Sequence, residues 1–250
     1  MTGKTCKRAP EHAIILSAGL GERMRPITDT LPKPLIPVRG QALIDSILDR
    51  LEAAGVTEVV VNLHHLGAMI EEHLRGRARP RIVFSHEENE RLETGGGVRK
   101  ALPLLGPDPF FAINGDVCWL DGMIPALDRL AAGWDEQAMD ALLLLHPTAT
   151  AYGYDGRGDF MLDPLGRAQR RGERQVAPFV FAGIQILHPR LFEGAPDGAF
   201  SLNTLYDKAA EAERLYGVRH DGEWFHIGTP QGLAEVEEAM RHMAFTSPQR

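Results

Sequence analysis

A glycine-rich turn with basic side chains follows the first apolar segment, and its residue types suit the binding of phosphate groups. The stretch from 16 to 37 reads LSAGLGERMRPITDTLPKPLIP. Gly19 and Gly21 allow positive φ and let backbone amides approach a ligand, so that successive N–H groups can converge on phosphate oxygens. The countercharge comes from three side chains, Arg23, Arg25 and Lys33. The pattern predicts a nucleoside triphosphate site.

Two common phosphate motifs do not fit this stretch. A Walker A loop ends in Gly-Lys-Ser or Gly-Lys-Thr, and the sequence contains neither. The dinucleotide motif G-x-G-x-x-G requires a third glycine where this chain has Met24. An NAD-dependent oxidoreductase is therefore disfavoured.

The elements that must position the turn alternate between strand and helix. Strands are predicted over 13–16, 57–63, 81–85, 110–114, 141–146, 158–162, 178–187, 218–220 and 224–227. Helices are predicted over 43–51, 66–75, 98–105 and 201–214 and from Pro230 onwards, with residues 244–250 fraying. This alternation indicates an α/β fold with a mixed, mainly parallel sheet and helices on both faces. Ligands of such sheets bind at the carboxyl ends of strands, where the glycine turn and Asp116 both fall.

Composition limits the classes of protein that the chain could be. Its 250 residues, 44% of them apolar, suffice for one domain over 1–250 with a full core. A net charge of −7 argues against nucleic acid as the partner. Cys6 and Cys118 are too few for a disulfide framework, and no stretch resembles a membrane span or a secretion signal. These features predict a cytoplasmic protein with a small polyanionic ligand.

The glycine turn fits the signature L-x-A-G-x-G-x-R-x-x-P-x-T followed by P-K-P-L-x-P, and the chain thereby resembles the sugar-phosphate nucleotidylyltransferases. Within that family it is most similar to the N-acetylmuramate 1-phosphate uridylyltransferases of bacterial cell-wall recycling. The resemblance extends over nearly the whole chain. It rests on LETGGGVRKALPLLG (92–106), FFAINGDV (110–117), GRGDF (156–160), FAGIQILHPRLFEG (181–194) and GAFSLN (198–203).

The resemblance implies a Rossmann-like nucleotidyltransferase fold, also described as GT-A-like. Residues from about 12 to 140 would bind the nucleotide and those from about 141 to 243 the sugar phosphate. The enzyme would transfer a nucleoside monophosphate from a nucleoside triphosphate, UTP above all, to a sugar 1-phosphate. The oligomeric state stays open, with a monomer as the simplest expectation.

The resemblance also assigns roles to individual residues. Arg23 would hold the β- and γ-phosphates, Lys33 would reach toward the α-phosphate, and Asp116 would bind Mg²⁺, which prefers carboxylate and phosphate oxygens. The other expected nucleotide contacts are Leu16, Ala18, Gly19, Gly21, Arg25, Glu93, Thr94 and Gly95. The three glycines 95–97 are also expected to leave free amides at a helix start. The expected sugar-phosphate contacts are Asn114, Gly183 and Asn203.

One position departs from the family pattern. Relatives supply a second metal carboxylate from W-x-D-x-G-T-P, whereas this chain has His226 in place of the aspartate. An imidazole suits transition metals better than Mg²⁺, so Mn²⁺ or another divalent ion is an alternative. His226 could bind such an ion, contact phosphate as a donor, or be structural.

Two other functions compete with this interpretation. A mannose 1-phosphate guanylyltransferase, or another hexose 1-phosphate nucleotidylyltransferase, would use the same phosphate-binding residues. A catalytically silent binding relative is the alternative from another class, and His226 is the main feature in its favour. Arg23, Lys33 and Asp116 argue against silence because all three are retained.

Overall fold

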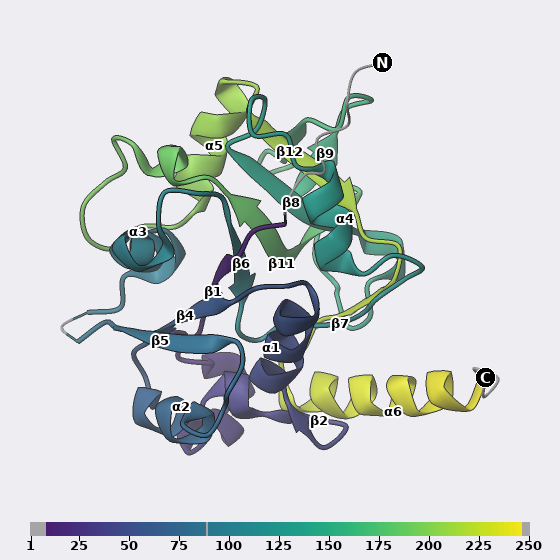
Figure 1. Ribbon diagram of the computed structural model, residues 1–250. Helices are drawn as coiled ribbons and strands as arrows, with labels where there is room; N and C mark the ends of the chain where they lie inside the picture. The colour runs from purple at the N-terminus through teal and green to yellow at the C-terminus, as the bar shows by residue number, and fades with distance from the viewer. Residues whose placement is uncertain (1–8, 89, 247–250) are drawn as a thin grey trace.

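The computed structural model, which describes residues 9–88 and 90–246, has a nine-stranded sheet at its centre (Figure 1). Its strands are β1 (His12–Leu16), β4 (Glu58–Leu63), β5 (Arg81–His86), β6 (Phe110–Asn114), β8 (Ala141–Pro147), β9 (Phe160–Leu162), β10 (Ala168–Arg170), β11 (Phe179–Leu187) and β12 (Leu215–Arg219). Two short pairs lie outside it, β2 (Pro37–Val38) with β3 (Gln41–Ala42), and β7 (Cys118–Leu120) with β13 (Glu223–Phe225). The predicted mixed sheet is confirmed.

Parallel and antiparallel pairing occupy different parts of the sheet. β1 pairs in parallel with β4 and β6, and β4 with β5, so these strands end at one edge. β11 is antiparallel to β6, β8 and β9 and joins the later strands to the earlier ones. The two halves of the chain therefore share one sheet.

Helices cover both faces of the sheet, as the sequence predicts. α1 (Leu43–Ala53), α2 (Gly67–Leu74) and α4 (Ala126–Gly133) contribute to one core cluster, and α3 (Glu93–Leu105) and α5 (Asn203–Glu211) to the other. Within β1, Ala13 and Ile15 pack into the cluster with α1, α2 and α4, and Ile14 packs into the cluster with α3 and α5. Strands buried on both faces need apolar residues at every position, which explains the continuous apolar runs.

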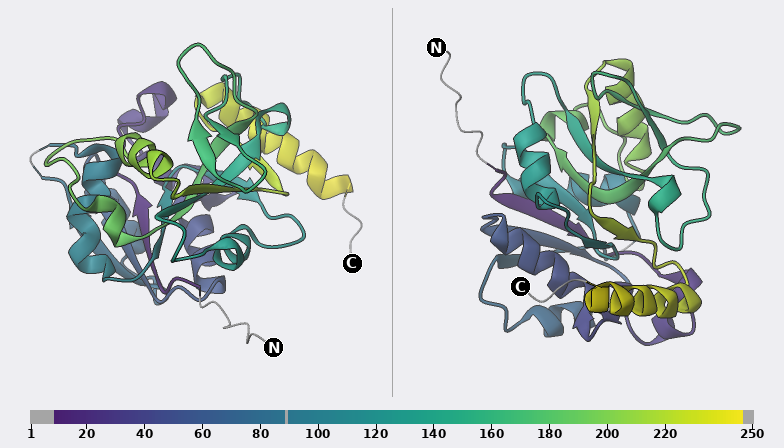
Figure 2. Two further views of the ribbon diagram at one scale, coloured as in Figure 1. Left: turned by 90° about the horizontal axis from the view of Figure 1, so that it is seen from above. Right: turned by 90° about the vertical axis from the view of Figure 1, so that its right-hand side faces the viewer.

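The last helix packs against the segment that contains Met24 and β2, and it does not contribute to the two main core clusters. α6 (Pro230–Thr246) lies beside β2, as Figures 1 and 2 show. Val236 and Met240 share a third apolar cluster with Met24 and Phe225. Thr229 Oγ1 accepts a hydrogen bond from the Gly232 N–H at 3.1 Å, which is the cap that the sequence predicts.

Several predicted element boundaries are wrong. α3 begins at Glu93 instead of Val98, because all three glycines lie inside the helix. α5 is shorter than 201–214, and residues 244–246 belong to α6, whereas 247–250 lie outside the described residues. β7, α4 and β10 were not predicted. β7 and β10 span three residues each, too few to show a periodic pattern, whereas the apolar periodicity of α4 was overlooked.

Two further findings bear on composition. Cys118 is buried as a free thiol, and burial raises its pKa to about 11, so it is an inert packing residue; Cys6 lies outside the described residues. In the described part of the chain, no helix has both the length and the apolar character needed to cross a bilayer.

Candidate active site

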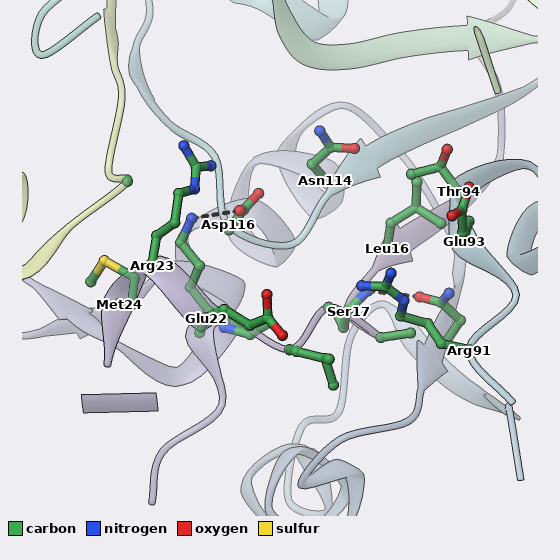
Figure 3. A pocket seen from close by; sticks show the side chains of 18 of the residues that line it. Leu16, Ser17, Glu22, Arg23, Met24, Arg91, Glu93, Thr94, Asn114 and Asp116 are labelled. Atoms are coloured by element: carbon green, nitrogen blue, oxygen red, sulfur yellow. Dashed lines mark hydrogen bonds and ion pairs between the residues drawn. The ribbon is translucent and has the colours of Figure 1, made fainter. Parts of the chain in front are cut away.

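Two adjoining cavities open at the carboxyl ends of β1 and β6. The larger is about 580 Å³ and the smaller about 250 Å³. They share four lining residues: Arg23, Lys33, Asn114 and Asp116. Figure 3 shows side chains of the larger cavity, with Arg23 and Asp116 at one end and Glu93 and Thr94 at the other. The shared residues come from two separate segments, which the parallel pairing of β1 with β6 brings together.

The glycine turn forms one wall of the larger cavity. Gly21 is required by the backbone, whereas Gly19 faces open space. Gly21 has φ +64°, and a Cβ there would lie 2.8 Å from Thr28 Cγ2, so the fold itself requires glycine. A Cβ on Gly19 would meet nothing within 4 Å. Leu16, Ala18, Gly19 and Gly21 all line the cavity.

Arg23 lies in a short 3₁₀ turn, Glu22–Met24, and the burial of the adjacent Met24 orients it. Met24 is 1% exposed and packs into the third apolar cluster, whereas Arg23 lines both cavities. Arg25 lines neither cavity. Its Nε instead lies 3.3 Å from Asp29 Oδ1 in an exposed ion pair. The expected nucleotide contact from Arg25 therefore has no support in this geometry.

Lys33 and Asp116 form an ion pair where the cavities meet, with Lys33 Nζ 2.6 Å from Asp116 Oδ2. Lys33 begins a 3₁₀ turn, and Asp116 follows β6. Gly115 permits this approach, because its N–H donates to the Leu16 carbonyl at 2.8 Å and a Cβ would lie 2.7 Å from Ser17 Oγ. The sequence predicted both charged residues for the site but not their direct pairing.

The smaller cavity is built largely from the second half of the chain. Gly183 lines it at φ +77°, within the irregular pairing of β11 with β8, and a Cβ there would lie 2.4 Å from Val117 Cγ1. Asp159, from the GRGDF segment, also lines this cavity and accepts a hydrogen bond from the Phe181 N–H at 2.9 Å. Asn203, by contrast, is exposed at the start of α5 and lines neither cavity.

His226 lines the smaller cavity between aromatic rings and charged groups. Its ring stands edge-on to Tyr154 at a centroid distance of 6.0 Å. Burial, followed by the positive charges of Arg23 and Lys33, lowers the pKa of His226, and Asp116 opposes this effect more weakly. The imidazole is therefore neutral at pH 7, so it places no additional positive charge beside the phosphates.

The residues present fit a divalent ion that takes most of its ligands from a substrate. Within residues 9–88 and 90–246, no group of three or more His, Cys, Asp or Glu side chains could hold a metal ion. Asp116 is 41% exposed at the junction of the cavities and offers a hard oxygen ligand. Mg²⁺ is commonly held by one or two carboxylates plus substrate phosphates, so one aspartate is sufficient in kind.

The opposite wall of the larger cavity is the start of α3. Glu93 and Thr94 line it, and Glu93 has φ +58°, which is uncommon outside glycine. Gly95 does not line the cavity, and two of the amides expected to be free have a partner: the Gly95 and Gly96 N–H groups donate to the Phe200 carbonyl at 2.8 and 3.2 Å. A Cβ on Gly95 would lie 2.3 Å from the Phe200 ring, so this glycine serves close packing.

Sequence reasoning missed several lining residues. They include Ser17, Glu22, Asn62, Arg91 and Ser201 in the larger cavity and Asp159 in the smaller one. Asn62 had a signal, because it is a polar residue near the end of an apolar strand parallel to β1. Arg91 lies in a loop and had none, whereas Ser201 lies in the 198–203 segment on which the resemblance rests.

Comparison with known proteins agrees with this architecture. The family model for nucleotidyl transferases matches residues 12–163. N-acetylmuramate alpha-1-phosphate uridylyltransferase from Caulobacter vibrioides is 43% identical over 92% of this chain and 97% of its own length. The enzyme of that name from Neisseria meningitidis is 37% identical over 90% and 96%.

Solved structures show the same fold at low identity. UDP-glucose pyrophosphorylase complexed with UDP-glucose superposes with a TM-score of 0.73 at 17% identity, covering 93% of this chain and 99% of that one. HddC from Yersinia pseudotuberculosis gives 0.72 at 20%, covering 92% and 99%. From the family match and the two close relatives, the chain belongs to the nucleotidyl transferase family and is a nucleotidyltransferase.

Proposed function

We propose that this enzyme transfers UMP from UTP to N-acetylmuramate 1-phosphate, giving the nucleotide sugar and pyrophosphate. The observation that carries the proposal is the pair of adjoining cavities that share Arg23, Lys33 and Asp116. A nucleotide in the larger cavity and a sugar phosphate in the smaller one would bring their phosphates together at these residues. The choice of uracil and of this sugar rests on the names of the two close relatives.

The chemistry requires no side-chain base. A phosphate monoester has a second pKa of about 6, so the attacking oxygen of a sugar 1-phosphate is already largely anionic at pH 7. That oxygen forms a bond to the α-phosphorus while the bond from this phosphorus to the bridging oxygen breaks, and pyrophosphate leaves with the electron pair. The protein must hold two polyanions in line and neutralise their repulsion.

Each charged residue has a role in that task. Arg23 and the amides of the glycine turn would hold the β- and γ-phosphates, and Lys33 would exchange its bond to Asp116 for one to the α-phosphate. Asp116 would hold Mg²⁺ or Mn²⁺, which supplies neutralising charge shared by both substrates. Neutral His226 would line the acceptor side without adding charge.

The wider biological role follows from this reaction. N-acetylmuramate belongs to peptidoglycan, so the proposed role is in the recycling of bacterial cell wall. The proposed location is the cytoplasm, in accordance with the sequence analysis. Residues from about 12 to 140 would carry the nucleotide and those from about 141 to 243 the acceptor, with Ser201 and Gly228 reaching back into the nucleotide cavity.

Pyrophosphate release tests the proposal directly. The purified protein is incubated with UTP, GTP or dTTP, with N-acetylmuramate, glucose or mannose 1-phosphate, and with Mg²⁺ or Mn²⁺. We expect the fastest release from UTP with N-acetylmuramate 1-phosphate. A preference for GTP with mannose 1-phosphate would replace the proposed substrate pair. Absence of release from every pair would favour the catalytically silent alternative.

A further inference from the structure

A buried chain of hydrogen bonds connects the two walls of the larger cavity. It begins at the Ser17 N–H, which donates to Asn62 Oδ1 at 2.7 Å. Asn62 Nδ2 then donates to Glu87 Oε1 at 2.7 Å, and Glu87 Oε2 accepts from the Leu92 N–H at 2.7 Å. Ser17 belongs to the glycine-turn wall, and Leu92 immediately precedes Glu93 on the α3 wall. Two side chains therefore bridge the walls at the ends of the parallel strands.

The bridge has no room to rearrange. Ser17 and Asn62 are each 2% exposed and Glu87 is 3% exposed. The Glu87 backbone N–H donates to the Leu63 carbonyl at 2.8 Å, which fixes the start of its side chain. A Cβ on Gly97 would lie 2.7 Å from Asn62 Nδ2 and 2.8 Å from Glu87 Oε1, so α3 closes over both groups.

The direction of the donors makes the chain of bonds specific. Both oxygens of Glu87 accept a hydrogen bond, one from the Asn62 amide and the other from the Leu92 N–H. Asn62 is thereby held with its amide nitrogen toward Glu87 and its oxygen toward the Ser17 N–H. A glutamine at position 87 would present one donor group to another donor, in a place where water cannot compensate.

We infer that Glu87 is a positioning residue for nucleotide binding: through Asn62, which itself lines the cavity, and through the Leu92 amide, it holds the glycine turn and the start of α3 at the spacing that the nucleotide requires. The inference rests on the proposed function in one respect, that the nucleotide occupies the larger cavity. Glu87 does not line the cavity, so it acts through Asn62 and the Leu92 amide and not by touching the ligand.

Exchanging the hydrogen-bond donor and acceptor groups of positions 62 and 87 tests whether the bridge positions the two walls or only fills space. Glu87→Gln breaks one bond of the bridge, and Asn62→Asp places two carboxylates against each other. The double variant Glu87→Gln/Asn62→Asp restores a complete set: the carboxylate introduced at position 62 accepts from the Ser17 N–H and from the amide introduced at position 87, whose oxygen accepts from the Leu92 N–H. Size and net charge of the pair are the same as in the natural protein. Glu88→Gln, at an exposed neighbouring position, is the matched control.

Calorimetry with UTP and steady-state kinetics provide the first measurement. We expect each single variant to bind UTP about tenfold more weakly, with the KM for the sugar phosphate nearly unchanged, because one buried hydrogen bond is lost on the nucleotide side. The double variant should bind UTP more tightly than Asn62→Asp, which places the same carboxylate on the cavity wall, and Glu88→Gln should match the natural protein.

Hydrogen exchange of the ligand-free protein is the second measurement and needs no substrate. The amides of Ser17 and Leu92 should exchange faster in the single variants and regain protection in the double variant. Unchanged UTP affinity in Glu87→Gln, or a double variant in which the amides of Ser17 and Leu92 fail to regain protection, would overturn the inference. If the variants show the predicted exchange pattern but the natural protein binds no UTP, the proposed function is overturned and the bridge is not.

Discussion

The two cavities are built in different ways, although they meet at the same four residues. The larger one lies at the ends of β1, β4 and β6, which run in parallel and bring Leu16, Asn62 and Asn114 to one edge. The smaller one is enclosed by antiparallel β11 and by segments that return from 159 and from 224–227. Parallel strands gather their ends by rule, whereas an antiparallel region assembles its site through long-range packing.

The chemical character of the walls differs as well. The larger cavity has a wall fixed by backbone groups and by the buried Glu87–Asn62 bridge. The wall of the smaller cavity includes the side chains of His226, Asp159 and the shared Asp116, which could contact a metal ion or a phosphate. We therefore expect changes in the wall of the larger cavity to act through geometry, and changes in the wall of the smaller cavity to alter the dependence on metal.

Removal of the Asp116 carboxylate, which lines both cavities, should have the largest effect on turnover. For Asp116→Asn we expect turnover to fall by about 10²-fold or more, because the metal ion that would neutralise both substrates loses its carboxylate ligand. Pyrophosphate release measures this loss. Asp116 is 41% exposed, so the melting temperature should be retained. Asp128→Asn, at an exposed position on α4, is the control, and an Asp116→Asn enzyme with normal turnover would remove Asp116 from the mechanism.

A pair of glycine substitutions distinguishes a wall built by packing from a wall left open for ligand. Gly95→Ala would put a Cβ 2.3 Å from the Phe200 ring, and we expect the free energy of unfolding to fall by about 1–3 kcal/mol, measured in urea. Gly19→Ala meets nothing within 4 Å and should leave stability within about 0.5 kcal/mol while raising the KM for UTP. Equal stability of the two variants would show that Phe200 yields to the added methyl group.

His226→Asp tests the difference on the acceptor side. A second carboxylate near Asp116 should lower the Mg²⁺ concentration needed for half-maximal rate by several fold, because Mg²⁺ prefers oxygen ligands. His226→Asn should not produce that shift, because asparagine has the size of aspartate but carries no charge. The metal dependence of pyrophosphate release measures both variants. If His226→Asp leaves metal requirement and metal preference unchanged, position 226 does not reach the ion.

The smallest expected effect concerns a histidine pair next to Trp224, which lines the smaller cavity. His146 and His220 are 2% and 1% exposed, their ring centroids lie 5.7 Å apart, and burial is the main cause that lowers the pKa of each. Their stabilising contribution is complete above the unfolded pKa of about 6.5 and declines as pH falls below it, because the unfolded chain takes up protons that the folded one resists.

Urea unfolding at pH 7.5, 6 and 5 measures this decline. His146→Gln removes one titrating ring, and we expect its stability to depend less steeply on pH between 6.5 and 5 than that of the natural protein. NMR titration of the remaining imidazoles gives a direct check. Identical slopes for the two proteins would mean that burial of His146 does not govern the acid response.

The prediction from sequence was strongest where the chemistry is local. The turn after β1 requires glycine for its backbone, and Gly21 does take a positive φ. It was weakest where a distant segment decides the outcome. The three glycines 95–97 gave the same signal as a phosphate-binding helix start, yet Phe200 takes two of their amides. Arg25 was expected from its charge beside the glycine turn and Asn203 from a segment shared with the family. Both side chains are exposed and lie outside the two cavities, because strand pairing does not fix exposed side chains.

The amino-acid sequence by itself determined the class of fold, the edge of the sheet where the site lies, and the grouping of Arg23, Lys33 and Asp116, because strand periodicity and glycine turns are properties of short segments. Only the tertiary structure decided that these residues line two cavities, that Lys33 pairs with Asp116, and that Glu87 ties the walls together. Those contacts join segments that are distant along the chain, and their free energy depends on burial and on distances that no local pattern encodes.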